Sequence, residues 1–160
     1  MEQRNRNQET YITNHIGVHA YFLNSRGEVL VLQRSASNRY KPLHWDIPGG
    51  KMLMHEDVEA AARREVREET GLELSGVGRP LSVYVNRSQL PVRKDVQIVF
   101  ECTVKDPDAP VTINPREHSA YRWIHPSRLK TIRCMEYLAF FYEQVLEGSV
   151  YESKTDFMRF

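Results

Sequence analysis

The amino-acid sequence predicts an α/β fold in which a mixed β-sheet is sandwiched between α-helices. Apolar and polar residues alternate near the beginning of the chain and again around residue 100, which is typical of strands. Two other segments, 57–70 and 133–147, carry apolar residues at helical spacing. The 160 residues are 41% hydrophobic, enough to bury one core. We therefore expect a single domain over residues 1–160, with a loose polar lead-in at 1–10.

Composition and charge exclude several classes of protein. The formal net charge is +1 and both signs are interspersed, so we expect no nucleic-acid and no membrane partner. The N-terminus lacks the apolar core of a signal peptide and no apolar run reaches about 18 residues, which predicts a cytoplasmic protein. Cys102 and Cys134 are too few for a disulfide scaffold or a zinc site, so we expect reduced packing residues.

The first strands are predicted over 16–23 and 28–34, on either side of a turn at 24–27. Together they predict a β-hairpin. Both strands carry apolar residues on both faces, which indicates a central place between layers. Residues 35–43 have the composition of a loop, and Arg34 ends the second strand.

Residues 44–50, HWDIPGG, are predicted to form a further loop. A Pro-Gly-Gly sequence is not expected to continue a strand or to begin a helix, but it lets the backbone approach a ligand closely. Trp45 is expected to pack rather than to stack on a ligand. The segment comes just before the first predicted helix.

The helix predicted over 57–70 has two distinct faces at 100° per residue. We expect the core face to hold Val58, Ala61 and Ala62. The opposite side holds Ala60, Arg63, Arg67 and Thr70. Gly71 follows where a left-handed cap is expected to end the helix.

The core face of this helix continues into carboxylates. Glu65 and Glu69 extend the apolar stripe, and Glu68 lies beside them. Like charges at this spacing repel one another and are costly to bury, so the cluster requires a cation. Oxygen ligands suit Mg²⁺, with Mn²⁺ as the alternative ion. The other interpretation is an exposed helix with ion pairs such as Arg64 with Glu68.

The flanking residues decide between the two interpretations. Gly50, Glu56 and the run Arg64–Leu72, REVREETGL, resemble the signature box of the Nudix hydrolases at every constrained position. The resemblance in element order extends from about residue 14 to about residue 147. It implies the Nudix fold, a sheet between helices, and Mg²⁺-dependent cleavage of a diphosphate bond in a nucleoside diphosphate derivative.

The same resemblance assigns roles residue by residue. It implies that Glu68 and Glu69 are the principal metal ligands, together with the Gly49 carbonyl. Glu56 would contribute a further contact, often through water. Glu65, also placed in the metal site, would orient or deprotonate the attacking water, and Arg64 would hold a box glutamate in place. Outside the box, Glu117 matches a residue that supplies an extra ligand or a base, so Glu65 and Glu117 remain rival catalytic bases.

The second half of the chain predicts strands over 81–85, 95–104 and 117–124, then the helix over 133–147. The loop between the first two strands is basic. We expect the substrate's terminal phosphates to be bound by Arg34, Arg87, Arg93 and Lys94. His118 is expected to be structural or exposed rather than a ligand, because no second histidine lies at ligand spacing.

Three functions remain to be distinguished. The short chain looks most like the MutT-like enzymes, which predicts a small nucleotide substrate, a nucleoside triphosphate cleaved to monophosphate and pyrophosphate. The alternative is a catalytically silent Nudix domain that binds a nucleotide as a sensor or interaction module, although such domains usually lose box glutamates. An isopentenyl diphosphate isomerase would need a catalytic cysteine near the cleft. The tail at 148–160 packs either on its own domain or in a homodimer.

Overall fold

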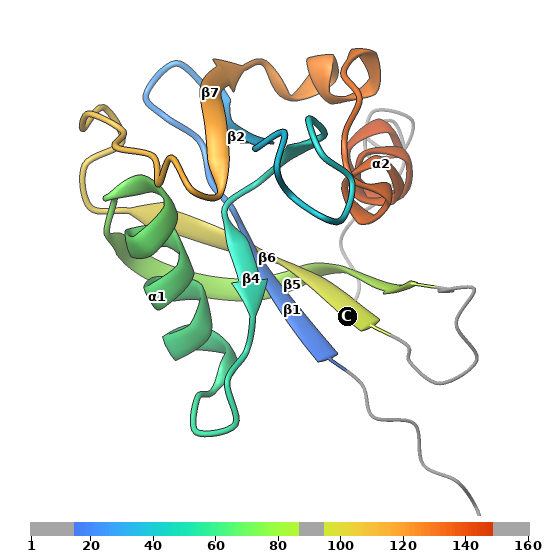
Figure 1. Ribbon diagram of the computed structural model, residues 1–160. Helices are drawn as coiled ribbons and strands as arrows, with labels where there is room; N and C mark the ends of the chain where they lie inside the picture. Colours follow the sequence, from blue (N-terminus) through green and yellow to red (C-terminus); the bar gives the residue numbers. More distant parts are fainter. Residues whose placement is uncertain (1–14, 87–94, 149–160) are drawn as a thin grey trace, which may run out of the picture.

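The computed structural model describes residues 15–86 and 95–148, which form two β-sheets flanked by helices (Figure 1). One sheet has four strands in the order β4-β1-β6-β5, and the other has three in the order β3-β2-β7. The strands are β1 (His15–Tyr21), β2 (Val29–Arg34), β3 (Trp45–Asp46), β4 (Gly49–Lys51), β5 (Leu74–Asn86), β6 (Asp95–Val104) and β7 (His118–Ile124). The helices are α1 (Val58–Thr70), η1 (Pro126–Thr131), α2 (Glu136–Phe141) and η2 (Tyr142–Glu147).

The predicted α/β class is confirmed, with a mixed sheet and helices on both sides. Strand β1 pairs in parallel with β6 and antiparallel with β4, whereas β5 pairs antiparallel with β6. Helix α1 lies on one side of this sheet and α2 on the other (Figure 1). The expected single sheet is replaced by two, because β2 and β7 pair with each other in a separate antiparallel sheet.

The predicted hairpin of the first two strands is wrong. Strands β1 and β2 belong to different sheets and are linked only by an isolated bridge between Leu23 and Val29. The turn itself forms as expected, because the Asn24 side chain accepts hydrogen bonds from two backbone amides within it. Both strands are central in their own sheets, which agrees with their apolar faces. Strand β1 instead pairs with β4 and β6, and β2 pairs with β3 and β7.

The prediction of a continuous loop over 44–50 is also wrong. Gly49–Lys51 form β4, which pairs with β1, and the Pro48 carbonyl accepts a hydrogen bond from the Ala20 amide at 2.8 Å. Glycine permits this pairing, because a Cβ at position 49 would overlap the Val18 carbonyl oxygen. The expected packing role of Trp45 is confirmed, since the ring is buried in the core.

Two apolar clusters occupy the two sides of the four-stranded sheet. The first unites the small residues of α1 with β1 and β6, and includes Ala61, Ala62, Val66, Val18 and Phe100. The second unites α2 with β2 and β6, and includes Leu138, Phe141, Val31 and Val99. The described cysteines are free thiols, with Cys102 buried and Cys134 partly buried, as expected for packing residues. Burial raises the pKa of Cys102 to about 12.

Helix α1 begins and ends where its sequence predicts. Asp57 caps the N-terminus by accepting a hydrogen bond from the Ala60 amide at 2.7 Å, and Gly71 ends the helix at φ 71°. Two predicted faces need correction. Val58 lies in the capped first turn and is 36% exposed, whereas Thr70 is fully buried. Burial of Thr70 is tolerated because its hydroxyl donates to the Val66 carbonyl and accepts from the Leu72 amide.

The remaining elements follow the prediction with shifted ends. Strand β5 is longer than expected, and the segment 74–80 contains two glycines and a proline that coincide with breaks in its pairing register. The C-terminal helix is divided into α2 and the wider turns of η2. Residues 149–160, on which the homodimer expectation depends, lie outside the described residues. Among the described segments there is no helix of the length and apolarity needed to cross a membrane.

Leu138 tests the second apolar cluster. Its side chain is completely buried, so Leu138→Ala should lower the free energy of unfolding by about 2–5 kcal/mol through lost contacts and a residual cavity. Leu23→Ala is the matched control at an exposed position and should change stability by less than about 0.5 kcal/mol. Urea unfolding of the two variants compares these values, and equal losses would show that α2 does not close this core.

Candidate functional site

The guanidinium group of Arg64 is the centre of the acidic cluster. It binds both carboxylate oxygens of Glu56, at 2.5 and 3.0 Å, and donates to the Lys51 carbonyl at 3.0 Å. Its Nη1 atom lies 2.7 Å from Glu65 and 3.2 Å from Glu68. One cation therefore holds three carboxylates and the backbone of β4. The sequence left two interpretations of the helix open, a cluster of carboxylates and an exposed helix with ion pairs. The structure contains both features, because Arg64 pairs with Glu68 and also binds the other carboxylates.

The carboxylates around Arg64 differ in environment. The pKa of Glu56 is lowered to about 2, chiefly because it hydrogen-bonds to Arg64 and secondarily to the Leu53 amide. Glu68 is the outermost, with 58% of its side chain exposed, so its expected burial is wrong. It belongs to the last turn of α1. Glu65 is partly buried, and its burial raises its pKa despite the opposing effect of Arg64.

Glu65 lies directly against the backbone of β4. A Cβ at position 50 would be 2.5 Å from the carboxylate carbon of Glu65, so only glycine leaves room for the observed side-chain position. This contact explains why Gly50 accompanies the helix glutamates in the same motif. It also fixes one side of the Glu65 carboxylate, while Arg64 fixes the other.

Glu69 is the most buried carboxylate of the cluster, with a residue exposure of 5%. One of its oxygens accepts a hydrogen bond from the Gly49 amide at 2.8 Å. Burial raises the pKa of Glu69 well above its usual value, and the nearby charges of Asp46, Glu65 and Glu117 act in the same direction. An ionised carboxylate in these surroundings needs a compensating positive charge.

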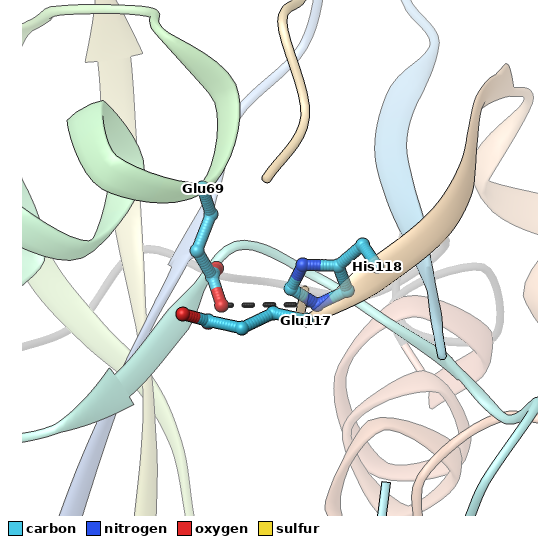
Figure 2. A group of neighbouring side chains, drawn as sticks. All are labelled: Glu69, Glu117 and His118. Carbon is cyan, nitrogen blue, oxygen red and sulfur yellow. Dashed lines mark ion pairs between the residues drawn. The ribbon is translucent and has the colours of Figure 1, made fainter. Parts of the chain in front are cut away.

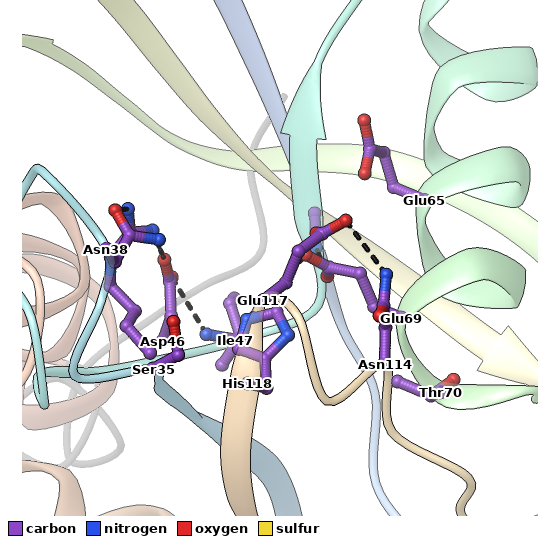
Figure 3. Close-up of polar contacts among 12 residues, drawn as sticks. Ser35, Asn38, Asp46, Ile47, Glu65, Glu69, Thr70, Asn114, Glu117 and His118 are labelled. Carbon is purple, nitrogen blue, oxygen red and sulfur yellow. Dashed lines mark hydrogen bonds and ion pairs between the residues drawn. The ribbon is translucent and has the colours of Figure 1, made fainter.

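Two residues from the other sheet complete the cluster. Glu117 precedes β7 and accepts a hydrogen bond from the Asn114 amide group at 3.0 Å, and His118 begins β7. Figure 2 shows both side chains pointing toward Glu69. The His118 ring is buried, as expected for a structural histidine, and its Nε2 atom lies 3.7 Å from a carboxylate oxygen of Glu69. Figure 3 places Glu65, Glu69 and Glu117 around one shared space.

The donor set fits a divalent cation. Glu69, Glu117 and His118 each offer an atom within 4.8 Å of the others. The pKa of Glu69 is raised because burying its ionised carboxylate is costly. A cation beside the carboxylate would offset that cost. Glu65, Glu68 and Glu56 add oxygens on the Arg64 side. The Gly49 carbonyl remains the predicted backbone ligand, while its amide is bound to Glu69.

A cleft of about 540 Å³ begins at β4 and extends between the four-stranded sheet and α2. Its polar lining includes Lys51 and Arg39, which provide positive charge, and Gln97 and Asn86, which provide amide groups. Tyr40 and Tyr84 give it aromatic surface. Asp46, Asp95 and Glu136 also line the cleft, so both signs of charge are present. A volume of this size suits a small organic ligand.

The floor of the cleft is a buried hydrogen-bond network. The Tyr137 hydroxyl donates to Asp46 and lies 2.8 Å from Nδ1 of His19, whose ring stacks on Tyr137 with centroids 4.0 Å apart. Nε2 of His19 lies 2.7 Å from the Gln97 side chain. Burial lowers the pKa of His19. Because every member is partnered and Asp46, His19 and Tyr137 are buried, the network gives the cleft a rigid polar floor.

The structure treats the predicted phosphate-binding cations differently. Arg34 lines the cleft, but its guanidinium already donates to the Tyr40 carbonyl at 3.0 Å and to Asn38 at 2.7 Å, and lies 3.6 Å from Asp46. A substrate contact of Arg34 remains a prediction. Arg87, Arg93 and Lys94 lie outside the described residues.

The structure brings the box residues close to Glu117, and it places the predicted residues Arg34 and Gly49 in the lining of the cleft. The sequence did not single out the other residues of the lining. Lys51 and Arg39 are isolated cations in the sequence, and no spacing marks them as partners. His19 and Tyr137 are 118 positions apart, so only the fold brings their polar atoms together. The signal that was available is the motif HWDIPGG, since Asp46 in it is a charge between residues that are otherwise apolar.

Comparison with known proteins agrees with this geometry. The sequence model of the NUDIX domain matches residues 13–143. The "Putative 8-oxo-dGTP diphosphatase" of Bacillus subtilis (strain 168) is 31% identical over 113 residues, which cover 71% of this chain and 68% of that protein. The asymmetrical bis(5'-nucleosyl)-tetraphosphatase of Mus musculus is 36% identical over 107 residues, covering 63% and 66%. The match spans only 36% of the longer Nudix hydrolase 5 of Arabidopsis thaliana.

Among solved structures, the MutT protein from Methanosarcina mazei Go1 superposes with a TM-score of 0.75 and 28% sequence identity. The superposition covers 88% of this chain and 98% of that protein.

Gly50→Ala tests the contact between β4 and helix α1. The new methyl group would displace the Glu65 carboxylate, whose far end can move, so the protein should still fold. We expect turnover to fall at least tenfold, with a melting temperature within a few degrees of the wild type. Gly148→Ala, where a Cβ meets only ordinary contacts, should leave turnover unchanged. Equal turnover of the two variants would show that Glu65 does not need its observed position.

Glu69→Gln tests the cost of burying a charge in the metal-free protein. Burial raises the pKa of Glu69 in the folded state. The wild type therefore keeps its full free energy of unfolding below the unfolded-state pKa of this carboxyl group, and loses part of it as the pH rises through the folded-state pKa. Glutamine does not ionise, so the variant does not lose stability in this way. With a chelator present, it should therefore have a higher melting temperature than the wild type at pH 8. The difference should shrink at pH 4. Thermal melts at both pH values decide this, and a lower melting temperature for the variant at pH 8 would contradict it.

Proposed function

The chain belongs to the MutT-like Nudix hydrolases, enzymes that cleave acid anhydrides, and from this premise we propose that it hydrolyses a nucleoside triphosphate to monophosphate and pyrophosphate in a Mg²⁺-dependent reaction. One observation carries the proposal. Arg64 holds Glu65 and Glu68 of α1 together with Glu56 and binds the backbone of β4. The same strand, Gly49–Lys51, lines a cleft of about 540 Å³ that has polar and aromatic walls. Catalytically silent Nudix domains usually lose box glutamates, whereas this chain keeps Glu56, Glu65, Glu68 and Glu69.

The diphosphate bond resists attack because its oxygens carry negative charge that repels a nucleophile. A divalent cation in the acidic cluster would supply positive charge against these oxygens. The side chains that would hold it are Glu69 and Glu68, with Glu56 and the Gly49 carbonyl as further ligands. Each of these assignments follows the box, and Glu69 is in addition the carboxylate whose burial calls for a cation.

The protein's own groups position water and the proton acceptor. Glu65 is held between Arg64 and the Gly50 backbone, so its carboxylate has little freedom to move. Glu117 is exposed and is fixed by Asn114 on the opposite side of the shared space. We propose that Glu65 is the base that accepts a proton from water, in preference to Glu117, because the position of Glu65 is the better restrained.

The cleft supports a small nucleotide as the substrate. Tyr40 and Tyr84 offer aromatic surface for a base, and Gln97 and Asn86 offer hydrogen-bonding groups. Lys51 belongs to β4 beside the acidic cluster, which is where phosphates would lie during the reaction. The relatives named for 8-oxo-dGTP and for bis(5'-nucleosyl)-tetraphosphate both act on polyphosphates of nucleosides, which agrees with this substrate class.

Product analysis in ¹⁸O-labelled water tests the reaction. Wild-type protein with Mg²⁺ should release pyrophosphate and nucleoside monophosphate from at least one triphosphate, with one ¹⁸O atom in one of the two products by mass spectrometry. Glu69→Gln is the matched control and should lower turnover by at least about 10²-fold, because it removes charge from the metal site. Orthophosphate as the sole phosphate product would contradict pyrophosphate release. Binding without turnover for every nucleotide would favour the sensor function.

A further inference from the structure

The side-chain amide of Gln97 is held at the wall of the cleft by two residues of β1. It lies 2.7 Å from Nε2 of His19, with its oxygen Oε1 at this contact. A Cβ at Gly17 would overlap the same oxygen, so glycine leaves the room that the amide occupies. The other end of the amide has no hydrogen bond to a described residue, and Gln97 lines the cleft. That end is available to a ligand.

An aromatic ring lies beside this amide. Strand β5 pairs Tyr84 directly with Gln97 of β6, so the two side chains emerge on the same face of the sheet. Tyr84 also lines the cleft, and its ring packs on Phe140 with centroids 5.4 Å apart. A ring next to an amide offers a stacking surface for a planar base and a hydrogen bond for the edge of that base.

The contact of Gln97 with His19 is the first of three hydrogen bonds in a row. Nδ1 of His19 lies 2.8 Å from the Tyr137 hydroxyl, and this hydroxyl donates to Asp46. Each hydrogen bond needs one hydrogen atom between its two heavy atoms. Because the single hydrogen of the Tyr137 hydroxyl lies toward Asp46, the bond between Tyr137 and His19 needs a hydrogen on Nδ1.

The hydrogen on Nδ1 decides the role of Nε2. A neutral imidazole carries one hydrogen, so Nε2 of His19 is then an acceptor and the group facing it must donate. The NH₂ end of the Gln97 amide is such a donor. The two ends of an amide have nearly the same shape, so a half-turn about its last bond exchanges them within the same space. The network therefore assigns the NH₂ end to His19 and the oxygen to the cleft.

The opposite orientation of Gln97 requires an additional charge. With Oε1 kept at His19, both ring nitrogens must donate, and His19 is then an imidazolium. The residue is only 5% exposed, and a charge is costly to bury. Asp46 does not need this partner, because the Arg34 guanidinium lies 3.6 Å from its carboxylate. The neutral network forms all three hydrogen bonds without a further charge.

We propose that Gln97 reads the base of the substrate as a hydrogen-bond acceptor, with its oxygen turned into the cleft by its bond to His19. An acceptor at this place favours a base with an exocyclic amino group over the matched base that carries an oxygen instead. Gln97 is the specificity residue, and His19 and Tyr137 are positioning residues that act through it. The proposal rests on the proposed function for its nucleotide substrate, but the state of the network is measurable without substrate.

The first experiment determines which nitrogen of His19 carries the hydrogen. The full chain is labelled with ¹⁵N-histidine and measured at neutral pH without nucleotide and with a chelator present. Two-bond ¹H–¹⁵N NMR correlations distinguish the Nδ1–H ring, the Nε2–H ring and the imidazolium. His19 should show the Nδ1–H pattern, and the loss of its signal in His19→Gln identifies it. If that variant does not fold, the signal that shifts most in Gln97→Met identifies the ring. An Nε2–H ring or an imidazolium would overturn the proposal.

The second experiment compares kcat/KM within pairs of triphosphates that exchange an amino group for an oxygen. ATP with ITP and CTP with UTP are such pairs. The wild type should favour the amino member of the pair that it hydrolyses by at least about fivefold, because a hydrogen bond left unmade in the cleft is costly. Equal values, or a preference for the oxygen-bearing member, would contradict the proposal.

Two variants of Gln97 test the acceptor itself. Gln97→Glu keeps an acceptor oxygen and should keep the preference for the amino member. Gln97→Met has a similar size but offers no acceptor of comparable strength, so the ratio should approach one. Because the ratio is taken within a pair, a general loss of activity cancels. A preference that survives in Gln97→Met would show that another group reads the base.

Tyr137→Phe tests the positioning role. It removes the hydroxyl that accepts from Nδ1, so His19 is free to carry its hydrogen on Nε2 and Gln97 to turn its NH₂ end toward the cleft. The preference should fall at least about fivefold, and the Nδ1–H pattern should be lost. Tyr21→Phe is the matched control, because its ring packs on Phe141 and does not line the cleft. It should keep the ratio and the pattern. Equal ratios in the two variants would overturn the positioning role.

Binding and turnover separate this proposal from the proposed function. If no nucleotide is hydrolysed, the ratio of dissociation constants within each pair, measured by calorimetry, replaces the ratio of kcat/KM. A preference for the amino member in binding alone would leave the reading of the base standing and remove only the reaction. Hydrolysis without any preference would do the reverse.

Discussion

The site depends on one guanidinium group that holds together carboxylates of the same charge. Arg64 binds Glu56 through Nε and Nη2, and it binds Glu65 and Glu68 through Nη1. Without this cation, adjacent turns of α1 would carry uncompensated repulsion along a face directed at the sheet. Because Arg64 also binds the Lys51 carbonyl, it joins the helix to β4 at the point where the acidic groups converge.

The close approach of α1 to β4 requires two adjacent glycines with different tasks. Gly49 donates its amide to Glu69 and pairs with His19 on β1. Gly50 leaves the space that the Glu65 carboxylate occupies. A Cβ at Gly49 would overlap the backbone of β1, and a Cβ at Gly50 would displace the Glu65 carboxylate. The motif therefore encodes a distance between two backbones as well as a set of acidic side chains.

Much of the fold and part of the site were predictable from local sequence. Asp57 and Gly71 mark the ends of α1 through capping chemistry that acts within one turn, so its boundaries were predicted correctly. The alternating apolar residues of β6 likewise identified a strand. The hairpin failed because β1 and β2 are both apolar on two faces, and such strands do not specify a partner. The strand Gly49–Lys51 was missed because its pairing depends on a neighbour distant in sequence.

The sequence by itself determined the chemistry of the acidic helix, because the spacing of Glu65, Glu68 and Glu69 on 3.6 residues per turn places them on adjoining positions of one helix. Only the tertiary structure decided how deeply each is buried, with Glu69 enclosed and Glu68 largely exposed. It also decided that His118, from the other sheet, faces Glu69 and that Tyr137 meets His19 under the cleft. Periodicity relates residues a few positions apart, whereas burial and contacts between distant segments depend on how the two sheets and the helices pack together.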